Sequence, residues 1–380
     1  MKYYRYIKYA SLVLILIFLL CGCGKPQKDY INIEFASWGS KSEIDIIKPI
    51  LSEFEKENPD IKVEFMHIPQ NYFQKIHLLF ASNKAPDVIF INNLYLPLYA
   101  NAGVLEPITL NENSFYKQSL DALSYNGKLY AIPRDVSNLV IFYNKDMFNK
   151  KQISYPKNNW SFEEFLTTAK KLTDENCFGI SFEEDPLFYL PYLMSNGGGI
   201  LPNELKKEES QKSLNFYADL RKKYHVAPKK SESASATMAQ MFLQQRLGMY
   251  LSGRWMVPKI REEAKFDWDI AKFPTGTKGS IVQLDASGWA ISKSSKHKKE
   301  ALKLIEYLSS KESIEKFSQS GLIVPAREDV ANSKAFLNEE KPKHNKIFIE
   351  IIPQSKPTPV TTNYREIIDN LRVQMEPKFN

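Results

Sequence analysis

The chain has 380 residues, of which 43% are hydrophobic and 13% aromatic. This content excludes an intrinsically disordered protein, and the length is sufficient for two ordinary domains. The formal net charge is +7 at pH 7, but lysine-rich clusters such as residues 296–299 stand beside polar turns and helix starts. We therefore interpret them as solvated surface and not as a nucleic-acid site.

The first 23 residues have the features of a secretory signal. Lys2, Arg5 and Lys8 form a basic leader, and an apolar run follows at 10–20. This run is shorter than the roughly 20 residues that span a membrane. Residues 20–23 read LCGC, which resembles the lipobox of bacterial lipoproteins, with Gly22 before an acylated Cys23. We expect a signal peptide at 1–22 and a lipidated tether at 23–29; the alternative is an ordinary signal peptide cut nearby.

Processing at Cys23 changes the charge and cysteine content of the mature chain. Its net charge is near +4, because the leader carries three basic residues and no acid. Only Cys177 remains as a free thiol, so no intrachain disulfide is expected despite the exported location.

Strands and helices alternate from residue 31 to residue 91. Apolar and polar residues alternate at 31–35 and 61–65, and 87–91 is typical of a fully buried strand. Apolar residues recur at helical spacing at 43–54 and 72–80. With right-handed crossovers, this order predicts an α/β fold with a mostly parallel sheet covered on both faces.

The alternation continues beyond a hairpin expected at 125–133. The further expected elements are, in order, a strand at 139–144, a helix at 160–172, a strand at 178–180, a glycine turn at 196–199, a helix at 214–224, a loop at 231–237, a helix at 238–245, strands at 247–251, 268–273 and 288–291, and helices at 300–308 and 314–319.

Five short motifs carry a family resemblance. They are NGKLYAIP at 126–133, FYNKDMF at 142–148, WSFEEF at 160–165, GRW at 253–255 and GWAIS at 288–292. In this order and spacing the chain resembles the bacterial extracellular solute-binding proteins of family 1, the sugar-binding lipoproteins of ABC importers that include the maltose-binding protein.

The resemblance implies a two-lobed, type II periplasmic-binding-protein-like fold with a cleft and a hinge. Lobe one would comprise residues 30–133 with 284–325, and lobe two residues 134–283 with 326–380. The resemblance further implies a monomer without cofactor, anchored to the cell membrane on its outer side, that delivers a sugar or small oligosaccharide to an ABC permease.

Ligands of open α/β sheets bind beyond the carboxyl ends of the strands. Polar and aromatic residues at such positions are the candidate ligand contacts: Trp38, Gln70, Asn93, Arg134, Asp135, Asn138, Tyr143, Gly253, Arg254, Trp255, Asp285 and Ser287. Aromatic side chains can stack on the apolar faces of a sugar, and carboxylates and amides can bind its hydroxyls. Trp38, Tyr143 and Trp255 are candidate platforms, with core packing as the alternative for each. We interpret Trp160 and Trp268 as structural.

Arg134 and Arg254 leave the charge of the ligand open. If both face the cleft without acidic partners, the ligand carries a carboxylate or phosphate, which guanidinium groups bind bidentately. If Asp135, Asp285 or another acid compensates them, the ligand is a neutral saccharide. We favour the neutral saccharide.

An exported carbohydrate-active enzyme is the main alternative class. It requires two carboxylates flanking the scissile bond, but we interpret the acidic clusters at 163–164 and 183–185 as solvated charge. No nucleophile elbow, zinc-binding helix or phosphate loop occurs, and the five histidines lack metal-ligand spacing. We therefore expect neither an enzyme nor a metal site. A receptor that reports its ligand to a sensor kinase is the remaining alternative.

Overall fold

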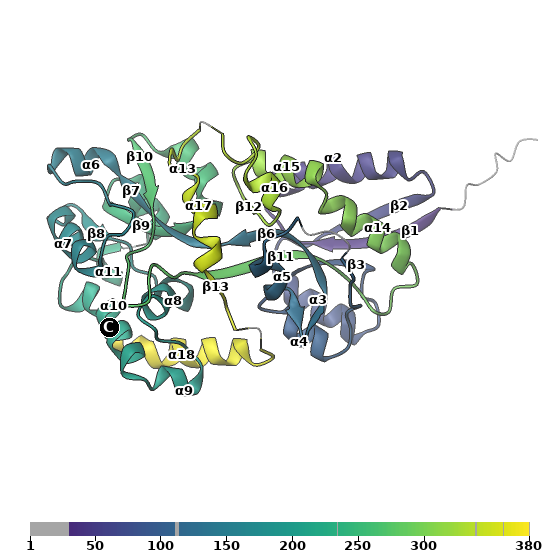
Figure 1. Ribbon diagram of the computed structural model, residues 1–380, viewed down its shortest axis with the longest axis horizontal. Helices are drawn as coiled ribbons and strands as arrows, with labels where there is room; N and C mark the ends of the chain where they lie inside the picture. Colours follow the sequence, from purple (N-terminus) through teal and green to yellow (C-terminus); the bar gives the residue numbers. More distant parts are fainter. Residues whose placement is uncertain (1–29, 111–113, 234, 339, 360, 380) are drawn as a thin grey trace, which may run out of the picture.

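The computed structural model describes residues 30–110, 114–233, 235–338, 340–359 and 361–379. The expected signal peptide and Cys23 lie outside these ranges. Figure 1 shows two lobes side by side along the long axis, with the strands β6 (Ala131–Ser137) and β11 (Gln283–Ile291) near their junction. Within the described ranges, none of the helices combines the length and apolar character that a membrane crossing requires.

Lobe one is built on a seven-stranded sheet. Its strand order is β12-β6-β11-β3-β1-β2, and β13 pairs with β11 beside this series. The other strands are β1 (Ile31–Ser37), β2 (Ile61–His67), β3 (Val88–Asn92), β12 (Val324–Pro325) and β13 (Lys356–Pro357). β1 is parallel to β2 and β3, whereas β11 is antiparallel to β3 and β6.

Helices cover this sheet because each presents an apolar stripe to it. In α2 (Lys41–Glu57) the stripe consists of Ile44, Ile47, Ile50, Leu51 and Phe54. A capping box between Ser40 and Glu43 begins the helix. The other helices around this sheet are α3 (Tyr72–Ala81), α4 (Leu96–Asn101), α5 (Lys117–Ala122), α14 (Lys298–Leu308), α15 (Lys311–Gln319) and α16 (Glu328–Ala331). The expected bounds assign α16 to lobe two, but it contacts β12 and α15.

The expected hairpin is present as β4 (Ser124–Tyr125) and β5 (Lys128–Leu129). Asn126 and Gly127 between them have φ angles of 49° and 74°. Positive φ at both central residues gives a turn whose twist matches that of the paired strands, which is why Asn-Gly is favoured there.

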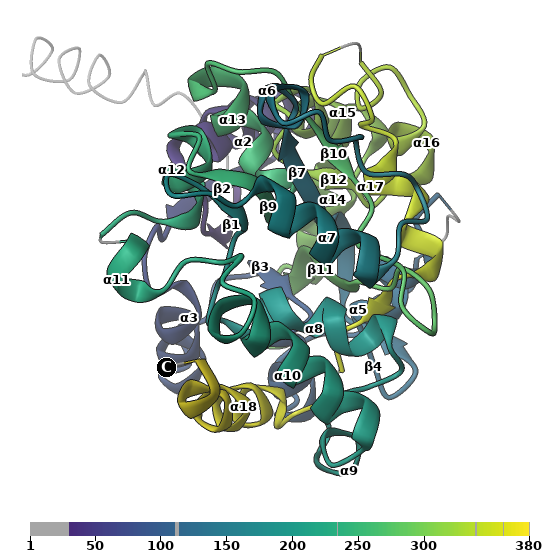
Figure 2. The same cartoon turned by 90° about the vertical axis from the view of Figure 1, so that its left-hand side faces the viewer.

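Lobe two contains a four-stranded sheet in the order β10-β7-β9-β8. Its strands are β7 (Leu139–Asn144), β8 (Phe178–Ile180), β9 (Leu247–Gly253) and β10 (Trp268–Ala271). The helices around it are α6 (Lys145–Lys150), α7 (Phe162–Leu172), α8 (Pro186–Ser195), α9 (Pro202–Leu205), α10 (Glu208–Lys222), α11 (Lys230–Ser233), α12 (Met238–Leu243), α13 (Val257–Glu263), α17 (Ile347–Glu350) and α18 (Tyr364–Phe379). The last helix, α18, packs against α10 and α8 (Figure 2).

The sheets are mixed and not mostly parallel, which corrects the expectation from sequence. In lobe two, β8 is parallel to β9, whereas β7 runs antiparallel to both β9 and β10. The strands change sheet at Asn138, between β6 and β7, a few residues after Pro133.

Several element boundaries also differ. Residues 231–237, expected as a loop, begin with part of the short helix α11. The strand expected at 288–291 begins at Gln283 as β11, and α10 begins at Glu208 instead of residue 214. α7 begins at Phe162, because Ser161 and Glu164 form its capping box.

Candidate functional site

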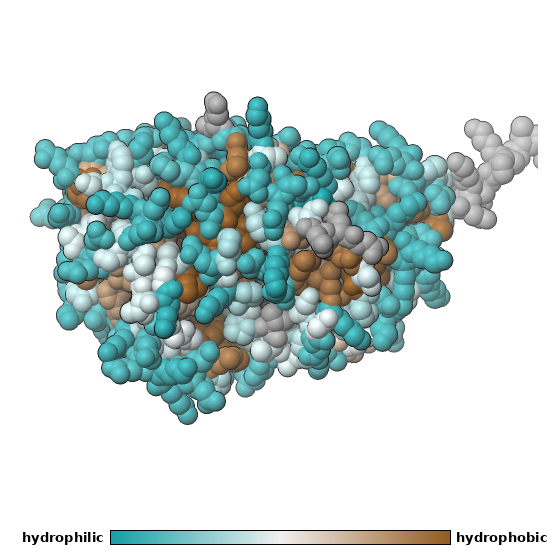
Figure 3. All heavy atoms as spheres, in the orientation of Figure 1, coloured by the Kyte–Doolittle hydropathy of each residue, from teal (hydrophilic) through white to brown (hydrophobic). Residues whose placement is uncertain are grey.

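A cavity of about 390 Å³ lies where the ends of the two sheets meet. Its walls come from both lobes. Lobe one contributes the residue after β1, the first turn of α2, and β3, β6, β11 and β12, and lobe two contributes the 3₁₀ turn η1 (Arg254–Met256) that follows β9. The lining residues are Trp38, Glu43, Phe90, Asn92, Leu94, Arg134, Asp135, Val136, Ser137, Arg254, Trp255, Asp285, Ala286, Ser287, Leu322, Ile323 and Val324. Most of the face seen in Figure 3 is hydrophilic. The cavity wall combines aromatic and aliphatic side chains with charged and polar groups, a composition that is typical of small-molecule sites.

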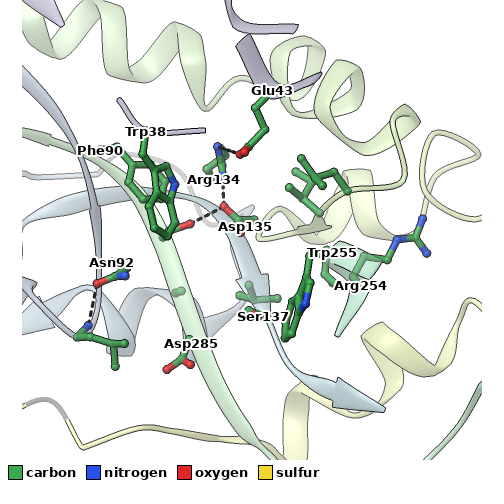
Figure 4. A pocket seen from close by; sticks show the side chains of 17 residues that line it. Trp38, Glu43, Phe90, Asn92, Arg134, Asp135, Ser137, Arg254, Trp255 and Asp285 are labelled. Atoms are coloured by element: carbon green, nitrogen blue, oxygen red, sulfur yellow. Dashed lines mark hydrogen bonds and ion pairs between the residues drawn. The ribbon is translucent and has the colours of Figure 1, made fainter. Parts of the chain in front are cut away.

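Two tryptophans flank the cavity from different lobes. Trp38 is 39% exposed, and its ring stacks on Phe90 with a centroid distance of 5.3 Å and an interplanar angle of 26°. Trp255 stands on the opposite side (Figure 4). Gly253 allows this position, since a Cβ there would lie 1.9 Å from Cζ3 of Trp255. A sugar ring between the two side chains would meet an aromatic surface from each lobe.

Arg134 is buried and its charge is compensated. Its Nε donates to Oδ1 of Asp135 at 2.6 Å, and Nη1 lies 3.3 Å from Oε1 of Glu43. Burial opposes the charge, but Asp135 and Glu43 outweigh this effect and raise the pKa of Arg134. Ser287 Oγ also donates to Oδ1 of Asp135, at 2.6 Å. Two of the three guanidinium nitrogen atoms, Nε and Nη1, are therefore engaged by protein carboxylates (Figure 4).

Asp285 has neutral partners. Its Oδ1 accepts hydrogen bonds from Thr358 Oγ1 at 2.6 Å and from Asn93 Nδ2 at 3.0 Å. Burial raises the pKa of Asp285, and the two hydrogen bonds oppose that shift. Asn93 is held in turn by the backbone N–H of Ala286, which donates to its Oδ1 at 3.0 Å. Asn93 thus orients the carboxylate of Asp285 through a hydrogen bond and does not itself line the cavity.

Arg254 has no carboxylate partner among the described residues, unlike Arg134. Its side chain is directed away from the cavity (Figure 4). Nε donates to the carbonyl of Gly321 at 2.8 Å, and Nη1 donates to Oδ1 of Asn345. The expectation that a nearby acid compensates Arg254 is therefore wrong, because neutral oxygen atoms occupy its donors.

The remaining candidates lie elsewhere. Tyr143 is 3% exposed and packs against Phe148 and Tyr155. Asn138 is buried between the sheets and donates to the carbonyl of Phe348 at 2.9 Å. Gln70 lies in an open groove that shares Trp38 and Glu43 with the cavity, and Gly253 packs behind Trp255. Trp160 and Trp268 are buried, as predicted.

Several lining residues were missed from the sequence. From sequence, Glu43 is recognised only as part of a helix, and Phe90 only as part of a buried strand. Leu322, Ile323 and Val324 enter the wall because β12 pairs with β6. Among the described residues, no group of three or more His, Cys, Asp or Glu side chains is placed to hold a metal ion.

The chain matches a family model described as bacterial extracellular solute-binding protein over residues 50–344. It belongs to this family. The expected family assignment is thus confirmed. The expected location outside the cell follows, because the family is described as extracellular.

Relatives and solved structures support the same fold. The galactooligosaccharide-binding protein of Bacillus subtilis is 25% identical over 355 residues, covering 88% of this chain and 82% of the relative. The multiple sugar-binding protein of Streptococcus mutans is 26% identical, with coverage of 83% and 81%. The structure of the Listeria monocytogenes ABC substrate-binding protein Lmo0181, in complex with cycloalternan, has a TM-score of 0.83 and 26% identity, covering 93% of this chain and 94% of that one. The two-lobed fold is confirmed.

Proposed function

We propose that this protein captures a neutral sugar or short oligosaccharide in the cavity between its lobes and delivers it to an ABC permease. The observation that carries the proposal is the compensated charge of Arg134, between Asp135 and Glu43, in a cavity flanked by Trp38 and Trp255. A carboxylate or phosphate ligand would require a free guanidinium group. Arg254 does not supply one, because its guanidinium is directed out of the cavity.

The lining groups match the two surfaces of a saccharide. The indole rings offer apolar faces, and Asp135, Asp285 and Ser287 offer hydroxyl partners. The cavity volume lies within the range of about 300–1,000 Å³ that is typical of small-molecule sites. Relatives named for galactooligosaccharides and for multiple sugars favour the same ligand class.

A thermal-shift screen tests the ligand class. Neutral mono- and oligosaccharides are compared with phosphorylated and carboxylated compounds of similar size. We expect one or more neutral saccharides to raise the melting temperature, because a ligand that binds only the folded state stabilises it by mass action. Stabilisation by anionic compounds alone would overturn the neutral-saccharide proposal.

We further propose that Cys23 carries the lipid anchor. Replacing Cys23 by Ala should remove acyl labelling and either leave the precursor uncleaved or release the protein from the membrane fraction. Cys177→Ala is the matched control and should change neither result, because Cys177 is buried within lobe two. Acyl labelling retained in Cys23→Ala would contradict the assignment.

A further inference from the structure

Two arginines of lobe two come together beside a glycine of lobe one. Arg254 belongs to η1 and Arg261 to α13, and Gly321 follows α15. Arg261 Nε donates to the carbonyl of Lys341 at 2.5 Å, and its Nη1 pairs with Glu340. After these contacts, Nη2 of Arg254 and Nη2 of Arg261 are both buried without a hydrogen-bond partner among the described residues.

The positive charge of this arginine pair is only partly compensated. Arg254 is 2% exposed and takes part in no ion pair within the described ranges. Among the described residues, Glu340 is the acid that pairs with Arg261, and its side chain is 63% exposed. Burial lowers the pKa of Arg254 to about 9, with a further contribution from Arg261, and Glu340 opposes this. A buried cation without a counter-charge is unfavourable unless a partner reaches it.

Gly321 lies close to both guanidinium groups. A Cβ on this residue would lie 2.9 Å from Nη1 of Arg261 and 3.8 Å from Nη2 of Arg254. The φ angle of Gly321 is +77°. A side chain here would therefore be strained and would also crowd both guanidinium groups.

We propose that a small inorganic anion, with chloride as the probe, binds between Arg254 and Arg261 beside Gly321. Guanidinium N–H groups form charge-assisted hydrogen bonds with anions, and the two Nη2 groups are free to donate them. The close packing around Gly321 favours a monatomic or similarly small ion. The site adjoins the solute cavity, because Arg254 is among the residues that line the cavity, but its guanidinium group is directed out of it.

The site lies at the junction of the lobes. Arg254 already donates to the carbonyl of Gly321 across this junction. An anion bound by both arginines would relieve their mutual repulsion and so stabilise the contact between η1 and the loop after α15. The bound anion would make the stability of the protein depend on the type of salt, which the capture of a neutral sugar does not predict.

Thermal melts of the mature protein without sugar test this site. Chloride is compared with gluconate at constant ionic strength, so that general screening is held fixed. We expect chloride to raise the melting temperature of the unaltered protein by about 2 °C or more. Gly321→Ala and Arg261→Gln should each lose this difference.

Gly103→Ala is the matched control for Gly321→Ala. Gly103 has a φ angle of +69°, and a Cβ there would meet no atom within 4 Å. It carries the same type of backbone strain without affecting the arginines, so the chloride effect should remain. If Gly321→Ala does not fold, Arg261→Gln decides the result. Equal melting temperatures in the two salts, or an equal chloride effect in all variants, would overturn the site.

A crystal grown in bromide gives a direct test. An anomalous peak in contact with both Arg254 and Arg261 is expected. A water molecule at that position, with no anomalous signal, would overturn the proposal.

Discussion

Trp255 is the lobe-two aromatic side chain of the cavity, so its truncation should affect binding more than folding. We expect Trp255→Ala to weaken binding of the stabilising saccharide by about 1–3 kcal/mol, or roughly 5- to 150-fold in Kd, because a large aromatic contact is lost. Titration calorimetry measures the affinity, and denaturant unfolding measures the stability.

Trp289 provides the contrasting control. It is fully buried and packs edge-on against Phe35 and Phe90. Trp289→Ala should lower the free energy of unfolding by about 3–5 kcal/mol, as large core truncations do. An unchanged Kd in Trp255→Ala would show that the ring does not contact the ligand.

Arg134 should matter to folding, because it compensates two carboxylates that are themselves largely buried. The side chains of Glu43 and Asp135 are each 13% exposed. Arg134→Met leaves both uncompensated and should lower the free energy of unfolding by about 3–5 kcal/mol. The exposed pair of Arg365 and Asp369 offers the control, since Arg365→Met should change stability by less than about 1 kcal/mol. Similar small losses in both variants would contradict the compensation.

The sequence predicted part of this residue-level picture. Strand ends suggested Trp38, Arg134, Asp135 and Trp255 as ligand contacts, and the structure places all four around one cavity. Their contact with a ligand stays a prediction. The partner of Arg134 was not predictable, because Glu43 lies 91 positions earlier and its sequence context indicates only the start of a helix. The outward direction of Arg254 depends on Gly321 and Asn345, which local sequence does not place nearby.

Elements with a strong apolar period were predictable, and those formed by tertiary pairing were not. The period of α2 and the alternation of β1 and β2 predicted them to within a few residues. The first half of β11, in contrast, has only a weak alternation, with Leu284 and Ala286 standing between Gln283, Asp285 and Ser287. Its extended conformation is fixed by pairing with β6 and β13. The strands β6 and β11 near the junction of the lobes also make the sheet of lobe one mixed, because β11 runs antiparallel to β3 and β6.

The end of β8 should introduce a pH dependence of stability. Tyr217 of α10 holds the backbone of Glu183 through its hydroxyl group, at 2.7 Å from the carbonyl and 3.0 Å from the N–H. Burial raises the pKa of the Glu183 carboxyl from 4.5 to about 7, and Asp185 and Glu184 add to the shift while Arg221 opposes it. The folded chain therefore binds more protons than the unfolded chain between these values, so this contribution to stability falls as the pH rises through them.

Glu183→Gln removes this titration and keeps the side-chain shape. The melting temperature of the variant relative to the unaltered protein should rise from about pH 5 to about pH 8. Glu163→Gln, at an exposed position of α7, should show a constant difference. A constant difference in both variants would refute the assignment to Glu183.

At the scale of the whole molecule, the cavity is shared between two lobes connected by few strands. The chain changes sheet at Asn138, whose side chain is fixed by the carbonyl of Phe348. β11 and β13 lie near the same junction. We propose that the segments at 132–135 and 283–285 allow the lobes to rotate. A ligand can drive closure only by binding the closed arrangement more tightly than the open one.

Solution X-ray scattering tests capture between the lobes most directly. The mature protein is measured alone and with a saturating amount of the neutral saccharide that most raises its melting temperature. If the saccharide bridges Trp38 of lobe one and Trp255 of lobe two, the lobes should approach each other and the radius of gyration should decrease. Trp255→Ala at the same saccharide concentration should show a smaller decrease. Identical scattering curves for the unaltered protein with and without bound saccharide would contradict the account.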